Sequence, residues 1–159
     1  MTWPPRGLGR LAAGVLLVCA AAWASTLWFS VALNMSHSLP GTLYVIHKHS
    51  GFQRGDLAAY HWHGGAGYPR GTIFIKRVAG LPGDTVRRVG SEFWVDDRAI
   101  GVAKPTSKAG RPMQPSASGV IAVNDYFMAT PHPDSLDSRY ALSGNIPLAD
   151  IIGKAYEIF

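Results

Sequence analysis

The chain has 159 residues, of which 47% are hydrophobic and 16% are charged. This length suits one domain of moderate size with its own core, and the composition excludes a disordered chain. The net charge is +5, but the basic residues form no run, which argues against a nucleic-acid partner. The single cysteine, Cys19, excludes an intramolecular disulfide and a cysteine-based metal site.

An apolar segment without any charged residue covers residues 11–33. Its length, roughly 20 residues or slightly more, is enough to cross a bilayer as a helix. Arg6 and Arg10 precede it, and the positive-inside rule keeps that end in the cytoplasm. We therefore expect residues 1–33 to form a cytoplasmic tip and a transmembrane anchor, and residues 34–159 to form a domain across the membrane.

A cleaved signal peptide is the alternative for the same segment. Ala22-Trp23-Ala24 has the small-x-small pattern of a cleavage site. Apolar residues continue well past Ala24, and this favours a retained anchor.

Ser38 follows the apolar segment at the entrance of an expected strand over residues 42–46. Pro40 forces the residue before it into an extended conformation. A serine in such a place is usually a solvated turn residue, and it becomes a nucleophile only if a base lies within hydrogen-bond reach. Its neighbour His37 should point to the opposite face of the chain, and it would also need an orienting carboxylate to act as the base.

Lys76 is the candidate base, because it interrupts the apolar run of residues 71–80, GTIFIKRVAG. Strand alternation places it on one face with Phe74 and Val78. Burial disfavours the ammonium form, so the pKa of this lysine should fall below the ordinary ~10.4. A lysine that is neutral at neutral pH can act as a general base. The alternative is an exposed strand lysine, with a packed stem and its amine in water.

The rest of the chain carries short strand and turn signals. Residues 85–100 predict two short strands with turns at residues 90–91 and 96–97, and residues 120–129 predict another pair of strands. Residues 101–118 are rich in Gly, Pro, Ser and Lys and predict an extended loop. Residues 153–155, Gly-Lys-Ala, predict a turn near the end of the chain. The histidine pairs His47/His49 and His61/His63 have no carboxylate or cysteine that completes a metal site, so we interpret them as exposed strand residues.

Three motifs stand in the order and approximate spacing of the type I signal peptidases, which are membrane-anchored Ser-Lys serine proteases. They are Ser38-Leu39-Pro40, residues 76–84 (KRVAGLPGD) and residues 135–139 (SLDSR). The chain more closely resembles the conjugative-transfer branch, the TraF-type peptidases that mature pilin precursors. It shares the pattern N-x-S/T-x-S-x-P-x-x-L-Y at residues 34–44 and Y-F-x-x-x-x-H-P-x-S-x-D-S-R-Y at residues 126–140. The short loop at residues 101–118, where larger signal peptidases carry an extra domain, also resembles this branch.

The resemblance implies a site in which Ser38 attacks a peptide carbonyl and Lys76 takes its proton. The backbone N–H of Ser38 and the hydroxyl of Ser36 would hold the oxyanion. No metal ion or cofactor is needed for this chemistry. In the pilin-maturing relatives, an amine of the pilin itself can replace water as the acceptor and give a cyclic product.

The polar segment of residues 130–139 would support this site. By resemblance, the Ser135 hydroxyl orients the amine of Lys76, and Asp137 and Arg139 form a buried or semi-buried pair. A bidentate Asp-Arg pair gives rigid geometry. The alternative is a polar turn with a surface salt bridge, which would contribute little to stability.

We expect a mainly β fold, with a catalytic domain of coiled antiparallel sheets behind one N-terminal transmembrane helix, because strand signals recur and no second helix pattern is convincing. The resemblance implies a serine endopeptidase of the signal peptidase type in the bacterial inner (cytoplasmic) membrane, with a cytoplasmic N-terminus and a periplasmic domain. Its substrate would be a pilin precursor for conjugative transfer or a type IV secretion pilus. The lipid bilayer and the secretion or conjugation machinery would be its other partners.

Two alternatives stay open. The first is a general signal peptidase I that removes signal peptides from exported preproteins. The second is a non-enzymatic anchored β-domain of a secretion apparatus, in which the three motifs are relict.

Overall fold

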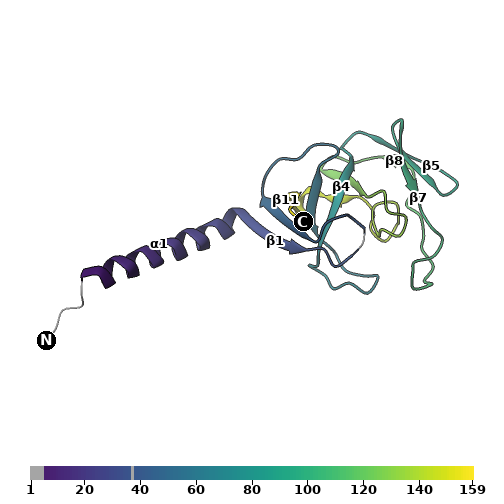
Figure 1. Cartoon of the computed structure of the whole chain (residues 1–159). Coiled ribbons are helices and arrows are strands. Elements are labelled where there is room, and N and C mark those ends of the chain that lie inside the picture. The colour runs from purple at the N-terminus through teal and green to yellow at the C-terminus, as the bar shows by residue number, and fades with distance from the viewer. Residues whose placement is uncertain (1–5, 37) are drawn as a thin grey trace.

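The structure is a computed structural model that describes residues 6–36 and 38–159. One long helix leaves the end of a β domain and extends away from it (Figure 1). The domain consists of two antiparallel sheets and a single short 3-10 helix, η1 (Leu148–Asp150), within the described residues. The predicted fold class, mainly β behind one N-terminal helix, is therefore confirmed.

Helix α1 (Arg6–Trp28) is long and apolar enough to cross a membrane. The most apolar window within Gly9–Trp28 has a mean hydropathy of 1.8, and none of that window is buried against the domain. By length and composition, α1 is a candidate membrane anchor or signal sequence.

The helix ends at Trp28, before the end of the predicted anchor. Residues Phe29–Leu33 form strand β1 instead, and β1 pairs along its whole length with β2 (Leu43–Lys48). Aromatic and β-branched residues such as Phe29 and Val31 favour strands. Pairing with β2 makes residues 29–33 a strand and not a continuation of the helix.

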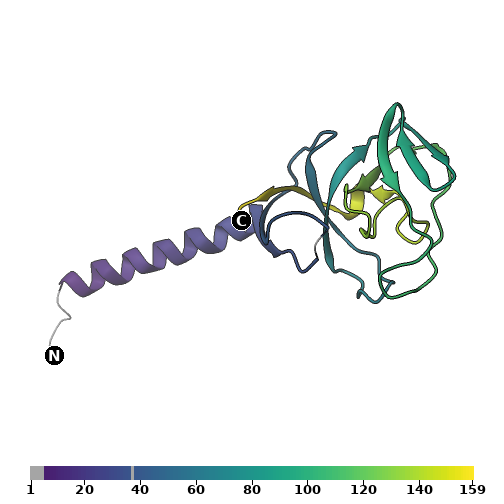
Figure 2. The ribbon, with the colours of Figure 1, turned by 45° about the vertical axis from the view of Figure 1, so that its right-hand side comes forward.

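The larger sheet has seven strands in the order β1-β2-β11-β3-β4-β9-β10. It curls into half a barrel, which is most visible in Figure 2. Its remaining strands are β3 (Leu57–His61), β4 (Ile73–Gly80), β9 (Asp125–Ala129), β10 (Ile146–Pro147) and β11 (Ile151–Glu157).

The smaller sheet has four strands in the order β7-β6-β5-β8. These are β5 (Thr85–Val89), β6 (Glu92–Val95), β7 (Arg98–Val102) and β8 (Gly119–Val120). The predicted turns at residues 90–91 and 96–97 join β5 to β6 and β6 to β7. This sheet lies on the side of the domain away from α1 (Figure 1).

Buried clusters join the sheets and hold the polar segment of residues 130–139. Phe93 and Val95 of the small sheet pack with Phe127 of the large sheet in one cluster, and Val78 packs with neighbours on the same sheet in another. Leu136 packs against both clusters. Because Leu136 sits between Ser135 and Asp137, this packing fixes the backbone that carries both polar side chains.

Gly153 lies inside β11, not in the predicted turn. Its φ is +153°, and a Cβ atom there would lie 2.1 Å from the carbonyl oxygen of His47 on β2. The pairing of β11 with β3 shifts register between Ile151 and Gly153. The glycine thus permits close packing of two strands at a bulge. This is a tertiary requirement, and in the sequence alone such a glycine looks the same as a turn glycine.

Candidate active site

The loop between β1 and β2 carries Ser36 and Ser38, and the side chain of Asn34 shapes this loop. Its Nδ2 donates to the carbonyls of Leu39 and Gly41, at 3.1 and 3.0 Å. Its Oδ1 accepts from the backbone N–H and from the hydroxyl of Ser36, both at 3.1 Å. Asn34 belongs to the motif at residues 34–44, but the sequence analysis gave it no role. Its four hydrogen bonds fix the conformation of this loop.

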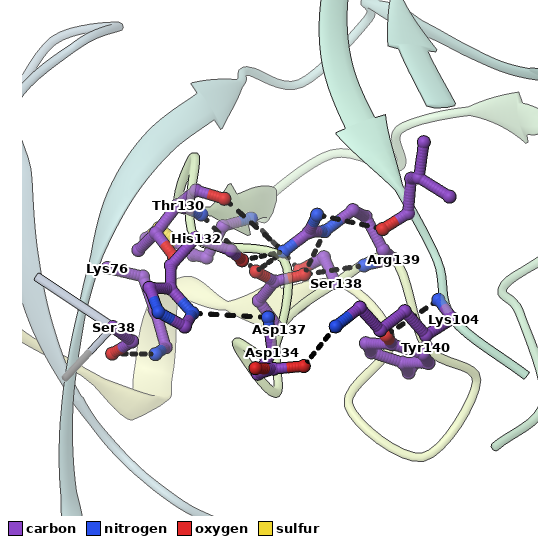
Figure 3. Close-up of polar contacts among 12 residues, drawn as sticks. Ser38, Lys76, Lys104, Thr130, His132, Asp134, Asp137, Ser138, Arg139 and Tyr140 are labelled. Carbon is purple, nitrogen blue, oxygen red and sulfur yellow. Dashed lines mark hydrogen bonds and ion pairs between the residues drawn. The ribbon is translucent and has the colours of Figure 1, made fainter. Parts of the chain in front are cut away.

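Lys76 on β4 points into the domain, and its side chain meets Ser38. The lysine is only 5% exposed, and its Nζ lies 2.9 Å from Ser38 Oγ (Figure 3). The alternative of a solvated strand lysine does not describe this residue, since both its stem and its amine are covered.

Burial lowers the pKa of Lys76 from its ordinary value to about 8. The negative charge of Asp137 opposes this shift, and the positive charge of Arg139 adds to it. At pH 7, roughly one molecule in ten would then carry a neutral amine, against fewer than one in a thousand for an ordinary lysine.

The two serines that were expected to assist the reaction occupy different positions. Ser36 Oγ lies 2.9 Å from Ser38 Oγ, so its hydroxyl is next to the candidate nucleophile. Ser135 is buried and lines the same cleft as Ser38 and Lys76. Its Oγ, however, has no hydrogen-bond partner within the described residues, so the expected contact with Lys76 is not made in this structure.

Asp137 and Arg139 form a fully buried bidentate pair. Their side chains are 0% and 1% exposed. Arg139 Nε donates to Asp137 Oδ1 at 2.9 Å, and a terminal guanidinium nitrogen donates to Oδ2 at 2.7 Å. The pair is therefore not the surface salt bridge of the alternative interpretation.

The remaining donors of Arg139 hold three backbone carbonyls. One is that of Val102 at the end of β7, at 3.0 Å, and the others are those of His132 at 3.0 Å and Thr130 at 3.3 Å. Figure 3 shows these contacts converging on the guanidinium. Arg139 thereby connects the small sheet to the polar segment that lies beside Lys76.

A cleft of about 580 Å³ opens over Ser38 and Lys76. Its walls come from the end of β1 and the following residues, from the first half of β4, and from residues 132–136. Among the described residues, β4 pairs with β3 from Ile73 onward, but with β9 only from Arg77 onward. The first half of β4 therefore presents one unpaired backbone edge.

Lys108 and Asp134, which sequence reasoning did not identify, line this cleft, and so does His132 of the motif at residues 126–140. Lys104 Nζ lies 2.5 Å from Asp134 Oδ1, and Lys108 Nζ lies 3.9 Å from Oδ2. His132 accepts a hydrogen bond at Nδ1 from the backbone N–H of Asp134. No local sequence signal distinguishes Lys104, Lys108 and Asp134 from ordinary surface charges. The alternative base His37 lies outside the described residues.

Known proteins resemble the chain over most of its length. The family described as "Signal peptidase, peptidase S26" matches residues 8–159. The chain is 35% identical over 86 residues to a probable conjugal transfer protein TraF of Sinorhizobium fredii, which covers 53% of this chain and 44% of that protein. It is 29% identical over 119 residues to signal peptidase I U of Bacillus subtilis, which covers 69% of this chain and 59% of that protein. The chain thus spans about half the length of these curated relatives.

We expect Arg139→Ala to lower the free energy of unfolding by about 3–5 kcal/mol, because Asp137 would remain buried as an unpaired charge. Lys104→Ala is the matched control, since it removes a cation that is 44% exposed from its pair with Asp134 and should cost at most about 1 kcal/mol. Thermal melts of both variants in detergent measure the difference. A melting temperature of Arg139→Ala equal to that of wild type would contradict the buried position of the pair.

Proposed function

The chain belongs to the signal peptidase family, peptidase S26, and on this premise we propose that it is a membrane-anchored serine endopeptidase with Ser38 as nucleophile and Lys76 as general base. The observation that carries the proposal is the 2.9 Å distance between Lys76 Nζ and Ser38 Oγ, combined with burial of the amine. A buried lysine is costly unless its amine has a use or a partner. A depressed pKa beside a serine hydroxyl is what nucleophile activation requires.

The reaction begins when the neutral amine of Lys76 takes the proton of Ser38, whose Oγ attacks the peptide carbonyl carbon. The tetrahedral oxyanion is held by the backbone N–H of Ser38 and by the hydroxyl of Ser36. Collapse of this intermediate breaks the C–N bond, and the ammonium of Lys76 gives its proton to the departing amine. The acyl group remains on Ser38 as an ester.

A second nucleophile then releases the product. Water that loses its proton to Lys76 gives a free carboxylate end. A substrate amine that attacks the same ester gives a new amide bond, and if that amine belongs to the same chain, the product is cyclic. In both cases the ester C–O bond breaks, and Lys76 passes the proton that it took from the nucleophile to Ser38 Oγ.

Ser135 takes the role of orienting the Lys76 amine in this proposal. Support comes from its buried place in the cleft wall and from its hydroxyl, which no described residue engages. A buried hydroxyl without a partner costs about 1–3 kcal/mol, so the amine or a water molecule in the cleft is its expected partner. Asp137 and Arg139 support the site by fixing the backbone on either side of this segment.

The substrate binds as an extended segment along the unpaired edge of β4. Free N–H and C=O groups at a sheet edge accept another strand readily. Apolar side chains of β1 and β4, such as Val31, Leu33 and Phe74, favour small apolar residues beside the scissile bond.

A pilin precursor is the substrate that we propose, with maturation for conjugative transfer or a type IV secretion pilus. Two observations support this choice: the motif pattern of the conjugative branch and the similarity to a probable conjugal transfer protein. Co-expression with candidate pilin precursors, followed by intact-mass analysis, tests it. Cleavage that depends on Ser38 is expected, and a product one water lighter than the linear form would indicate cyclisation.

General signal peptidase activity is the second candidate, favoured by the similarity to signal peptidase I U over 69% of the chain. Rescue of a strain depleted of its own signal peptidase, without cleavage of any pilin precursor, would establish it in place of pilin maturation. A scaffold without enzymatic activity would not be labelled at Ser38 by a serine-reactive acylating probe.

We further propose that α1 is a retained anchor with a cytoplasmic N-terminus, and that residues 29–159 form the periplasmic catalytic domain. Arg6 and Arg10 support this orientation, and pairing of β1 with β2 moves the expected boundary from residue 33 to residue 28. A periplasm-active reporter fused to the C-terminus should be active. A silent reporter would contradict the orientation, and a mature chain starting at Ser25 would identify a cleaved signal peptide.

The Ser-Lys assignment predicts that Ser38→Ala and Lys76→Met each abolish cleavage. The double variant should be no worse than either single one, since members of one catalytic unit are not additive. Lys76→Arg should fail as well, because guanidinium stays protonated. His37→Ala should keep most of the activity. Turnover of a pilin precursor in membranes by Lys76→Met, with none by His37→Ala, would assign the base to His37.

A further inference from the structure

The helix α1 and the wall of the cleft form one continuous piece of chain. The helix ends at Trp28 and β1 begins at Phe29, so there is no linker between them. Each residue of β1 pairs with β2, from Phe29 opposite His47 to Leu33 opposite Leu43. The last residues of β1 already line the cleft. Figures 1 and 2 show the strand continuing directly from the helix into the domain.

Two side-chain contacts fix the junction between helix and sheet. Lys48 at the end of β2 donates from Nζ to the carbonyl of Thr26 in the last turn of α1, at 2.7 Å. The ring of Phe29 stacks on the ring of His47, with centroids 4.8 Å apart and planes at 22°. Both contacts join the end of the anchor to the same strand, β2.

The contact made by Lys48 meets a requirement that the helix cannot meet by itself. The last carbonyls of a helix have no partner within the helix, and the negative end of its dipole favours a cation nearby. Helix α1 has no basic residue in its own last turn. Lys48 supplies both the charge and the donor from the catalytic domain.

We propose that Lys48 locks the membrane helix to the catalytic domain and so sets the height of Ser38 above the bilayer, making distance from the membrane a determinant of which peptide bond is cut. This inference rests on the proposed peptidase function. A strand rises about 3.3 Å per residue, so β1 carries the chain roughly 16 Å beyond the helix before the loop with Ser38 begins. A membrane-embedded substrate would need an extended segment of matching length to reach the cleft.

The test uses the full-length protein in liposomes and a set of membrane substrates. Each substrate has one apolar helix, a Gly/Ser spacer of varied length, and the same cleavage segment with alanine on both sides of the scissile bond. A soluble peptide with that segment reports on the chemistry alone. Wild type should show a clear optimum in spacer length.

Lys48→Ala should reduce the preference for the optimal spacer about threefold to tenfold, the loss expected for one hydrogen bond, and leave cleavage of the soluble peptide unchanged. Lys48→Arg should retain the optimum, because it keeps the donor and the charge. Lys154→Ala is the matched control. Lys154 lies opposite His47 on the neighbouring strand β11 and pairs with Asp56 at 2.9 Å. A flat dependence for wild type, or an unchanged optimum for Lys48→Ala, would overturn the inference.

A distance measurement tests the lock without any need for activity. Spin labels at Cys19 in α1 and at Val89→Cys, an exposed position on β5, report on the helix relative to the domain. The distance distribution should be narrow with Lys48 present, broader in Lys48→Ala and narrow in Lys154→Ala. Equal widths in all three would show that Lys48 does not fix the helix. If wild type cleaves neither the soluble peptide nor any pilin precursor, the proposed function fails, and this measurement still decides the lock.

Discussion

The burial of one amine next to one hydroxyl is the constraint on which the rest of the domain depends. The proposed Ser-Lys chemistry requires that Lys76 lose its proton near neutral pH, which its burial favours, and that its Nζ stay within reach of Ser38 Oγ. The curled sheet provides the cover. The Asp137–Arg139 pair fixes the neighbouring segment with opposing effects on the pKa of Lys76. The carboxylate of Asp137 raises this pKa, and the guanidinium of Arg139 lowers it. An unpaired carboxylate at that place would hold Lys76 in its charged form.

The lowered pKa of the buried Lys76 reduces the free energy of unfolding at neutral pH. The pKa of Lys76 is about 8 in the folded protein and ordinary, ~10.4, in the unfolded chain. The unfolded chain therefore binds more protons between these values, and the free energy of unfolding rises with pH across that window. Below pH 8 the buried ammonium costs the fold about 3 kcal/mol, at 1.36 kcal/mol per pKa unit. The proposed activity needs this destabilising burial of the amine, and such a loss of stability in favour of activity is common at functional sites.

Local sequence patterns predicted those features that strand periodicity or motif order determines. Alternation in the apolar run placed Lys76 on the same face as Val78, and the structure buries both. The fate of Phe29–Leu33 was not predictable in this way, because an apolar segment suits a helix or a strand and β2 supplies the partner. The turn prediction for Gly153 was wrong, because this glycine is required by the close approach of the His47 carbonyl on a neighbouring strand. Asn34 was left without a role, because its hydrogen bonds reach residues five and seven positions further along the loop. The hydrogen bond from Lys48 to Thr26 joins the end of α1 to strand β2. These residues are far apart in the chain, so no local sequence pattern predicts the contact.

Direct titration of Lys76 tests the central claim, that this residue is a neutral amine base. NMR of protein with isotope-labelled lysine side chains, with the Lys76 signal assigned by its loss in Lys76→Met, follows the amine through the pH range. The account predicts a midpoint at about pH 8, with acylation of Ser38 by a serine-reactive probe rising through the same midpoint. A midpoint at the ordinary lysine value of ~10.4, or acylation that does not follow the titration of Lys76, would contradict it.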